Sequence, residues 1–136
     1  MGKLDLNFSG SIFRKDFPMV IATNRASAIL LPVRVRYASG GYVAGQVLAQ
    51  NSVDSLFQKY DDGGSSGINT AKCILFESLS EGDFDAANAT GSTTAVGIFG
   101  GCTVFKDKLV GYDSNAATDL GAKEITDSTG VTILKF

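Results

Sequence analysis

Val33-Arg34-Val35-Arg36-Tyr37 alternates apolar and basic residues, and this stretch decides the fold class. Successive side chains of a strand point to opposite faces, so Val33, Val35 and Tyr37 are expected on a buried face and both arginines on the other. Ser39-Gly40-Gly41 then predicts a turn. Residues 42–49 predict a second strand region, which Gly45 interrupts.

Other apolar runs extend the β pattern in both directions along the chain. The expected β segments are residues 19–37, 71–79, 95–99, 103–105 and, as a closing strand, 131–136. Polar and glycine-rich stretches predict loops at residues 61–67 and 80–94. Lys106-Asp107-Lys108 is expected at the tip of a tight hairpin that returns through residues 109–111.

One helix is expected in this mainly β chain. Ser114 is a candidate N-cap, the residues after it favour a helix of about two turns, and Gly121 is placed to end it. The chain has 136 residues, 16 of them Gly and only two Pro, and 44% are hydrophobic. This composition predicts a single folded domain of short strands and turns around an apolar core.

Composition also excludes several classes of chemistry. The chain contains no His, which removes Ser-His-Asp, Cys-His and His-zinc sites because all of these need an imidazole. Cys73 and Cys102 lie in apolar segments without CxxC spacing, so they are predicted to be buried hydrophobic side chains.

The longest apolar stretch, residues 28–33, is far shorter than the roughly 20 residues of a membrane-spanning helix. We expect no membrane partner and synthesis in a cytoplasm, since residues 1–6 lack the apolar core of a secretory signal.

Charge is unevenly distributed along the chain. Residues 1–36 hold six Lys or Arg and two Asp or Glu, whereas residues 37–136 hold six and twelve, which together give the net charge of −2. The positive charges of the leading part are spread out, and the sequence pI is about 4.9. We therefore expect no nucleic-acid partner.

Residues 1–18 predict an extended N-terminal arm. The arm begins with the alternation Leu4-Asp5-Leu6-Asn7-Phe8-Ser9, which suits a strand with one apolar face. Such a short strand is not stable alone. It either pairs with the chain's own sheet or stays mobile until it adds to the sheet edge of another protein. Residues 19–136 then form a single β-rich domain.

Two motifs invite a chemical interpretation, and neither has the full pattern. Gly97-Ile98-Phe99-Gly100-Gly101 lacks both GxGxxG and GK[ST], so a bulge or close strand approach is expected instead. Glu81-Gly82-Asp83-Phe84-Asp85 lacks the EF-hand order of ligands, and with Asp61-Asp62 it would suit a hydrolase only if one cleft joined the two loops. We expect no enzyme activity, no cofactor and no metal site.

The chain resembles the head decoration, or capsid cement, proteins of tailed bacteriophages related to the lambda head decoration protein D. The likeness spans residues 37–136 and depends on the order and spacing of several short segments. These are residues 44–49 (AGQVLA), 59–61 (KYD), 71–75 (AKCIL), 95–98 (AVGI), Val104 to Leu109, 119–122 (DLGA), Ile125 and 130–136 (GVTILKF).

This resemblance implies a small β-tulip-like or barrel domain that forms a homotrimer on the outer surface of the virion capsid, at three-fold and quasi-three-fold positions. It implies a cement that binds the major capsid protein and stabilises the expanded head against internal DNA pressure, without enzymatic activity. The N-terminal segment of the family contacts the shell. The corresponding candidates in this chain are apolar Leu4, Leu6, Phe8, Ile12 and Phe13, together with basic Arg14 and Lys15.

Other functions stay open at this point. A second phage structural role, in a tail or in binding the host surface, could use a similar small β domain. A sugar-binding module would be favoured if Tyr42 or Tyr60 were exposed on a platform, and a carboxylate hydrolase if the two acidic loops met.

Overall fold

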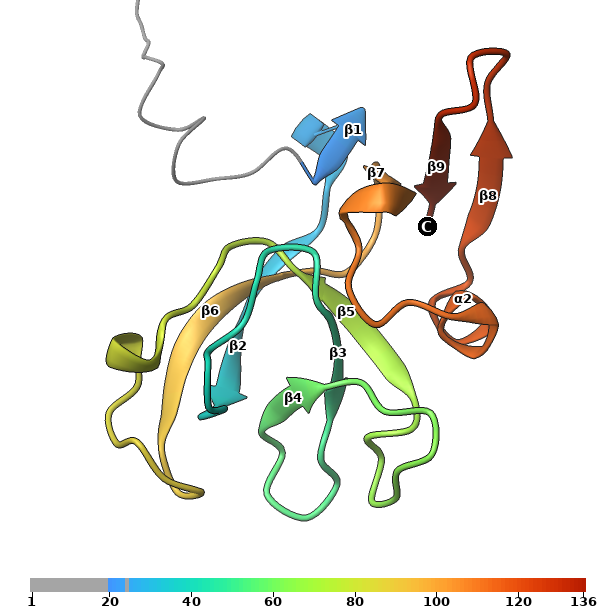
Figure 1. Ribbon diagram of the computed structural model, residues 1–136. Coiled ribbons are helices and arrows are strands. Elements are labelled where there is room, and N and C mark those ends of the chain that lie inside the picture. The colour runs from blue at the N-terminus through green and yellow to red at the C-terminus, as the bar shows by residue number, and fades with distance from the viewer. Residues whose placement is uncertain (1–19, 24) are drawn as a thin grey trace, which may run out of the picture.

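A computed structural model describes residues 20–23 and 25–136, which form a five-stranded barrel and a four-stranded sheet (Figure 1). The barrel order is β2-β4-β3-β5-β6, closing back on β2, and the outer sheet has the order β1-β7-β9-β8. The expected mainly β barrel is therefore confirmed, with one short α-helix among the described residues. In chain order the elements are β1 (Ile21–Thr23), the 3-10 turn η1 (Arg25–Ser27), β2 (Leu30–Arg36), β3 (Val47–Gln50), β4 (Phe57–Lys59), β5 (Ala71–Leu75), η2 (Glu81–Asp83), β6 (Ser92–Ile98), β7 (Thr103–Phe105), η3 (Lys106–Lys108), α2 (Ser114–Leu120), β8 (Lys123–Thr126) and β9 (Thr132–Lys135).

The alternation of β2 builds the inside of the barrel. Val33 and Val35 are buried in the barrel cluster, with Tyr37 packed against it, while Arg34 is exposed on the outside. β2 pairs antiparallel with β6 along its whole length, and a parallel pairing of Val35 with Phe57 of β4 closes the barrel. The two faces predicted from the sequence are those observed.

The outer sheet packs on the outside of the barrel. Ile74 of β5 and Ile98 of β6 form one buried cluster with Val104 of β7 and Leu134 of β9. Each of these side chains is no more than 1% exposed. The apolar row on the outside of the barrel thus positions the second sheet, because an apolar surface of this kind is stable only when another layer packs on it.

α2 covers another part of the barrel surface. Ala116 is buried against Val47 and Ala71, and Gly121 ends the helix with φ of 66°, as predicted. The predicted N-cap is wrong by one residue: Asp113 accepts a hydrogen bond from the Ala116 amide at 2.8 Å, and Ser114 is the first helical residue. Asp and Ser cap helix N-termini about equally well, so the sequence alone did not show which of Asp113 and Ser114 is the N-cap.

The hairpin predicted at residues 106–108 is also wrong. β1 and β9 already pair with the two edges of β7, so no edge is left for a strand returning through residues 109–111. The η3 turn instead directs the chain to the barrel, where the Val47 amide donates to the Val110 carbonyl at 2.9 Å.

Several predicted strand limits shift for reasons of pairing. β6 begins at Ser92, inside the predicted loop 80–94, because Arg34 of the partner strand donates to Ser92 Oγ and Thr94 Oγ1, each at 3.0 Å. β5 ends at Leu75 rather than at residue 79, and β3 starts only at Val47. β8 was not predicted, and it forms by pairing with β9.

Gly45 permits the close approach of the barrel to the segment after η3. Its φ of +94° lies in the left-handed region, and a Cβ there would collide with the Lys108 carbonyl. The Gly45 carbonyl accepts from the Val110 amide at 3.0 Å, so a side chain at this position would separate two hydrogen-bonded segments.

Gly45→Ala should lower the free energy of unfolding by more than about 1 kcal/mol, since it adds both backbone strain and a steric collision. Gly130→Ala is the matched control, because Gly130 has φ of +93° but nothing within 4 Å of its Cβ position. Equilibrium unfolding in urea measures both. Equal losses for the two variants would contradict the close packing at Gly45.

Candidate docking surface

The predicted arm residues all lie outside the described residues. They are Leu4, Leu6, Phe8, Ile12, Phe13, Arg14 and Lys15. Val20, the first residue that the structure describes, is 1% exposed, and its carbonyl accepts from the Phe105 amide at 2.9 Å. The described part of the chain therefore begins at the outer sheet, directly before the edge strand β1.

The outer sheet has apolar residues on both faces. Residues directly opposite one another in antiparallel strands share a face. Val104 and Leu134 are such a pair and point to the barrel, so the next pair, Phe105 with Ile133, points away from it, together with Ile125 of β8. None of these three outward residues belongs to a buried cluster.

Val131 continues this outward row at the turn between β8 and β9, where it is 44% exposed, as is Ile125. We call Phe105, Ile125, Val131 and Ile133 the sheet patch. A sheet face that carries adjacent apolar side chains on neighbouring strands is normally covered, so this patch is a candidate contact surface.

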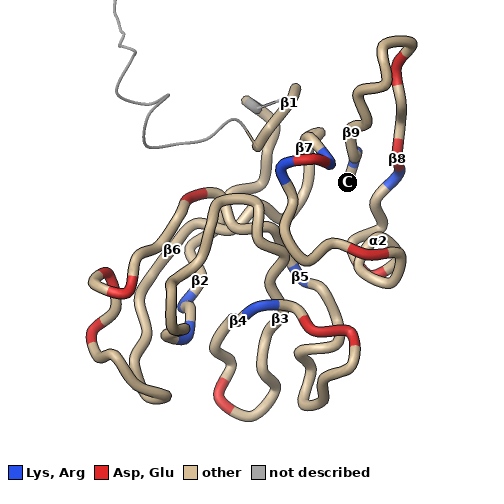
Figure 2. Tube along the Cα trace, viewed as in Figure 1, with Lys and Arg blue, Asp and Glu red and all other residues tan. Residues whose placement is uncertain are grey.

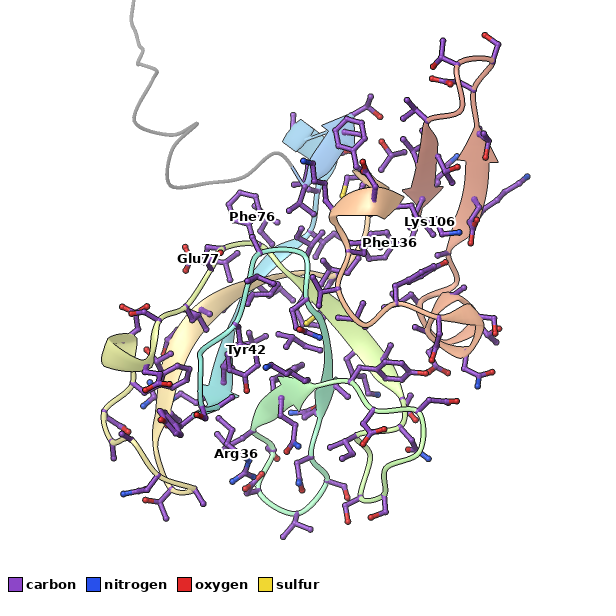
Figure 3. The ribbon with its side chains drawn as sticks, viewed as in Figure 1. Arg36, Tyr42, Phe76, Glu77, Lys106 and Phe136 are labelled. Carbon is purple, nitrogen blue, oxygen red and sulfur yellow. The ribbon has the colours of Figure 1, made fainter. Side chains whose placement is uncertain are left out.

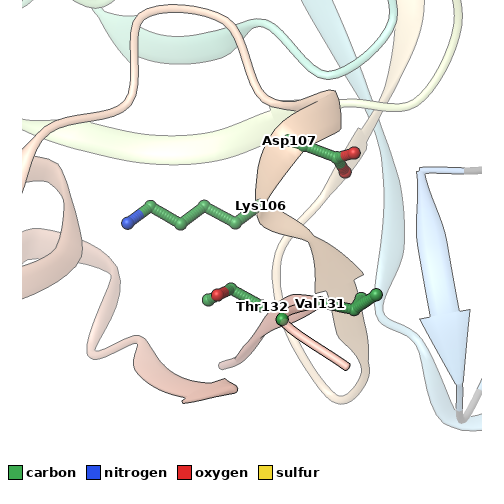
Figure 4. A pocket seen from close by; sticks show the side chains of 5 residues that line it. Lys106, Asp107, Val131 and Thr132 are labelled. Carbon is green, nitrogen blue, oxygen red and sulfur yellow. The ribbon is translucent and has the colours of Figure 1, made fainter. Parts of the chain in front are cut away.

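A shallow depression adjoins the sheet patch. It has a volume of about 400 Å³ and lies between η3 and the β8–β9 turn (Figure 4). Lys106, Asp107, Gly130, Val131 and Thr132 line it, so Val131 is common to the depression and to the patch. The uncovered apolar face therefore includes a hollow that can receive a side chain.

A second group of exposed apolar residues precedes and begins β2. Ile29 and Leu31 are alternate residues, so they point to the same side of the strand, and they are 49% and 47% exposed. We call these two residues the β2 patch. Leu30 lies opposite Ile98 and points to the other face. The backbone of Ile29 is held by hydrogen bonds with Phe99 and Gly100 at 2.8 Å, which fix the patch on a rigid part of the fold.

The acidic loops are engaged in separate structural roles. Asp62 accepts from Asn115 and Tyr60 beside α2, whereas Asp85 pairs with Arg34 at 3.1 Å on the outside of β2. The depression that includes Asp83 is lined by residues 77–79 and by Thr93 and Thr94 of β6, and not by the Asp61-Asp62 loop. The cleft expected for a carboxylate hydrolase is not formed by these two loops.

The arginines of β2 are also occupied. Arg34 contacts Asp85, Ser92 and Thr94, and Arg36 pairs with Asp54 and donates to the Ala89 carbonyl at 3.0 Å. Charged residues are spread over both layers, with the acidic ones mainly in connecting segments (Figure 2).

Tyr42 and Tyr60 are buried rather than displayed on a platform. Tyr42 lies inside the barrel (Figure 3), is 4% exposed and donates to the Arg36 carbonyl at 2.6 Å. Burial raises the pKa of Tyr42 to about 12. Burial also raises the pKa of Tyr60, helped by its hydrogen bond to Asp113 at 2.9 Å. The exposed aromatic surface that would favour sugar binding is absent at these two positions.

Cys73 and Cys102 are buried, as predicted. Across residues 20–23 and 25–136, no group of three or more Cys, Asp or Glu could hold a metal ion. Within the same ranges no helix is long and apolar enough to cross a membrane. Residues 97–101 end β6 and lead into β7. A phosphate-binding loop would instead lead into a helix.

Comparisons with protein-family models, with curated proteins and with solved structures gave no significant match. The resemblance to phage decoration proteins therefore stays a prediction from the sequence.

The sheet patch was not among the candidate residues found in the sequence. One signal pointed to it: residues 131–135 (VTILK) have apolar side chains on both faces, which is typical of a strand covered on both sides. Sequence predicted that this strand docks in the core, and Leu134 does, but Ile133 and Val131 point the other way.

The two thiols should stay unmodified by iodoacetamide at pH 8 in the folded protein. Both thiols are buried away from the reagent, and burial raises the pKa of Cys73 to about 12 and also raises that of Cys102, which disfavours the reactive thiolate. Mass spectrometry should find both sites alkylated after unfolding in guanidinium. Rapid modification of either thiol in the native protein would contradict its burial.

Proposed function

We propose that this chain is a structural protein of a tailed-phage virion. In this proposal it decorates the outer surface of the capsid as a homotrimer, binds the major capsid protein through residues 1–18, and stabilises the expanded head without catalysing a reaction. The protein is made in the cytoplasm of the bacterial host.

The observation that carries the proposal is the order and spacing of the short segments that resemble the decoration family. Residues 71–75 form β5, residues 95–98 lie in β6, and residues 130–136 contain β9. The likeness thus falls on strands of both the barrel and the outer sheet, and supports a similar arrangement of layers.

The position of the arm fits this role. Val20 is held beside β7 by the hydrogen bond from the Phe105 amide, so the residues before it connect to the outer sheet. Leu4, Leu6 and Phe8 lie on one face of the alternating segment, which suits addition to a sheet edge of the shell. Backbone hydrogen bonds would hold the arm there, and the apolar side chains would set its register.

Three arms on one body bind more tightly than one. If each arm bound with roughly millimolar affinity, about 4 kcal/mol, joining three on one rigid trimer would raise avidity by about 10² to 10⁴ when the sites are correctly spaced. Neighbouring coat subunits would then be held against outward pressure, and an immature shell with different spacing would bind poorly.

Deleting residues 1–15 should abolish binding to expanded, undecorated heads while leaving a folded trimer. Co-sedimentation with heads measures the binding, and analytical ultracentrifugation measures the mass. Unchanged sedimentation of the truncated protein with heads would refute the arm hypothesis.

Leu6→Asp should weaken head binding by at least tenfold, because it places a charge on the apolar face of the arm. Asn7→Asp is the matched control: it adds the same charge to the opposite face, and we expect a change of less than about twofold. Similar losses in both variants would show that the arm acts only through its net charge.

A further inference from the structure

Two apolar surfaces of this molecule lack a partner among the described residues. They are the sheet patch on the outer sheet and the β2 patch at the start of strand β2. Four of the eight large apolar side chains that are exposed in the described part of the chain belong to these two patches, and Phe105 and Ile133 of the sheet patch are half-buried. None of the residues in either patch is a member of a buried cluster.

We propose that the sheet patch of one copy packs against the β2 patch of a second copy, head to tail, and that three such contacts close a ring. This inference rests on the homotrimer of the proposed function and locates its interface. A ring with three-fold symmetry needs two different surfaces on each subunit, since each contact joins unlike patches. The molecule carries two such surfaces.

Charge favours contact between unlike patches over contact of the sheet patch with itself. Lys135 pairs with Lys123 across β9 and β8, and both lysines lie on the outward face beside Ile133 and Ile125. Two sheet patches packed face to face would bring four lysines to one interface, which costs free energy by repulsion and desolvation. Residues 26–33, which contain the β2 patch, carry no charge.

Shape favours the same pairing. The depression of about 400 Å³ at the end of the sheet patch is lined by Val131, Gly130 and Thr132 and by the charged residues Lys106 and Asp107. Aliphatic side chains of the β2 patch, such as Ile29 or Leu31, can fill such a hollow and exclude water from it. The contact would also cover the face of β8, an edge strand whose four residues are all exposed.

Three single substitutions test the interface. Ile125→Glu places a charge in the sheet patch, and Ile29→Glu places one in the β2 patch. Val53→Glu is the control, because Val53 is 82% exposed in the β3–β4 connection and belongs to neither patch. All three positions are exposed, so the variants should unfold at temperatures close to that of the unchanged protein.

Sedimentation equilibrium should give a three-copy mass for the unchanged protein and for Val53→Glu. Ile125→Glu and Ile29→Glu should each weaken association at least tenfold and give a single-copy mass. A three-copy mass for either variant would overturn the pairing of unlike patches.

Mixing the two variants tests the head-to-tail geometry. The Ile29→Glu protein keeps an intact sheet patch, and the Ile125→Glu protein keeps an intact β2 patch. One contact can therefore form between one copy of each variant. The mixture should give a two-copy species, which cannot close a ring. A mixture that stays single-copy would overturn the inference. If deleting residues 1–15 abolished the trimer, the inference would also be overturned, because the N-terminal arm rather than a direct contact between the two patches would then hold the copies together.

Head binding separates this inference from the proposed function. A single-copy unchanged protein that still binds heads would overturn the interface and leave shell binding intact. A three-copy ring that does not bind heads would contradict the decoration role but would not contradict the proposed interface between copies.

Discussion

The outer sheet depends on one apolar contact with the barrel. Ile74 and Ile98 on the outside of the barrel are buried against Val104 and Leu134 of the sheet. Fully burying each of these side chains contributes roughly 1.5 to 3 kcal/mol, more than a small sheet of short strands gains from pairing alone. Without this contact, the four short strands β1, β7, β9 and β8 would have only their own pairing to hold them together.

The same contact produces the surfaces on which the functional proposals depend. Because Val104 and Leu134 point to the barrel, the strand period of two turns Phe105 and Ile133 outward. The sheet patch is thus a geometric consequence of how the sheet packs. The arm attaches to this sheet through β1, so one rigid layer carries both the proposed shell contact and the proposed contact between copies.

Many of the polar groups that suggested chemistry have structural partners instead. Asp113 caps α2 and accepts from Tyr60, Asp119 accepts from the Ala71 amide at 2.9 Å, and Arg34 joins β2 to β6 through Ser92 and Thr94. These bonds fix helices and loops on the barrel and rigidify it. A rigid body of this kind suits a protein that must hold its binding segments at fixed spacing.

Local patterns in the sequence were enough to determine the faces of β2, the end of α2 at Gly121 and the burial of both cysteines, because each depends on residues adjacent in the chain. Tertiary structure alone decided that Val110 pairs with the barrel, that β8 exists, and that Phe105 and Ile133 point away from the barrel and are only half-buried. Those outcomes depend on which strand edges are already paired and on which of two apolar faces meets the barrel. Both are set by contacts between residues far apart in the chain, which the period of a single strand does not specify.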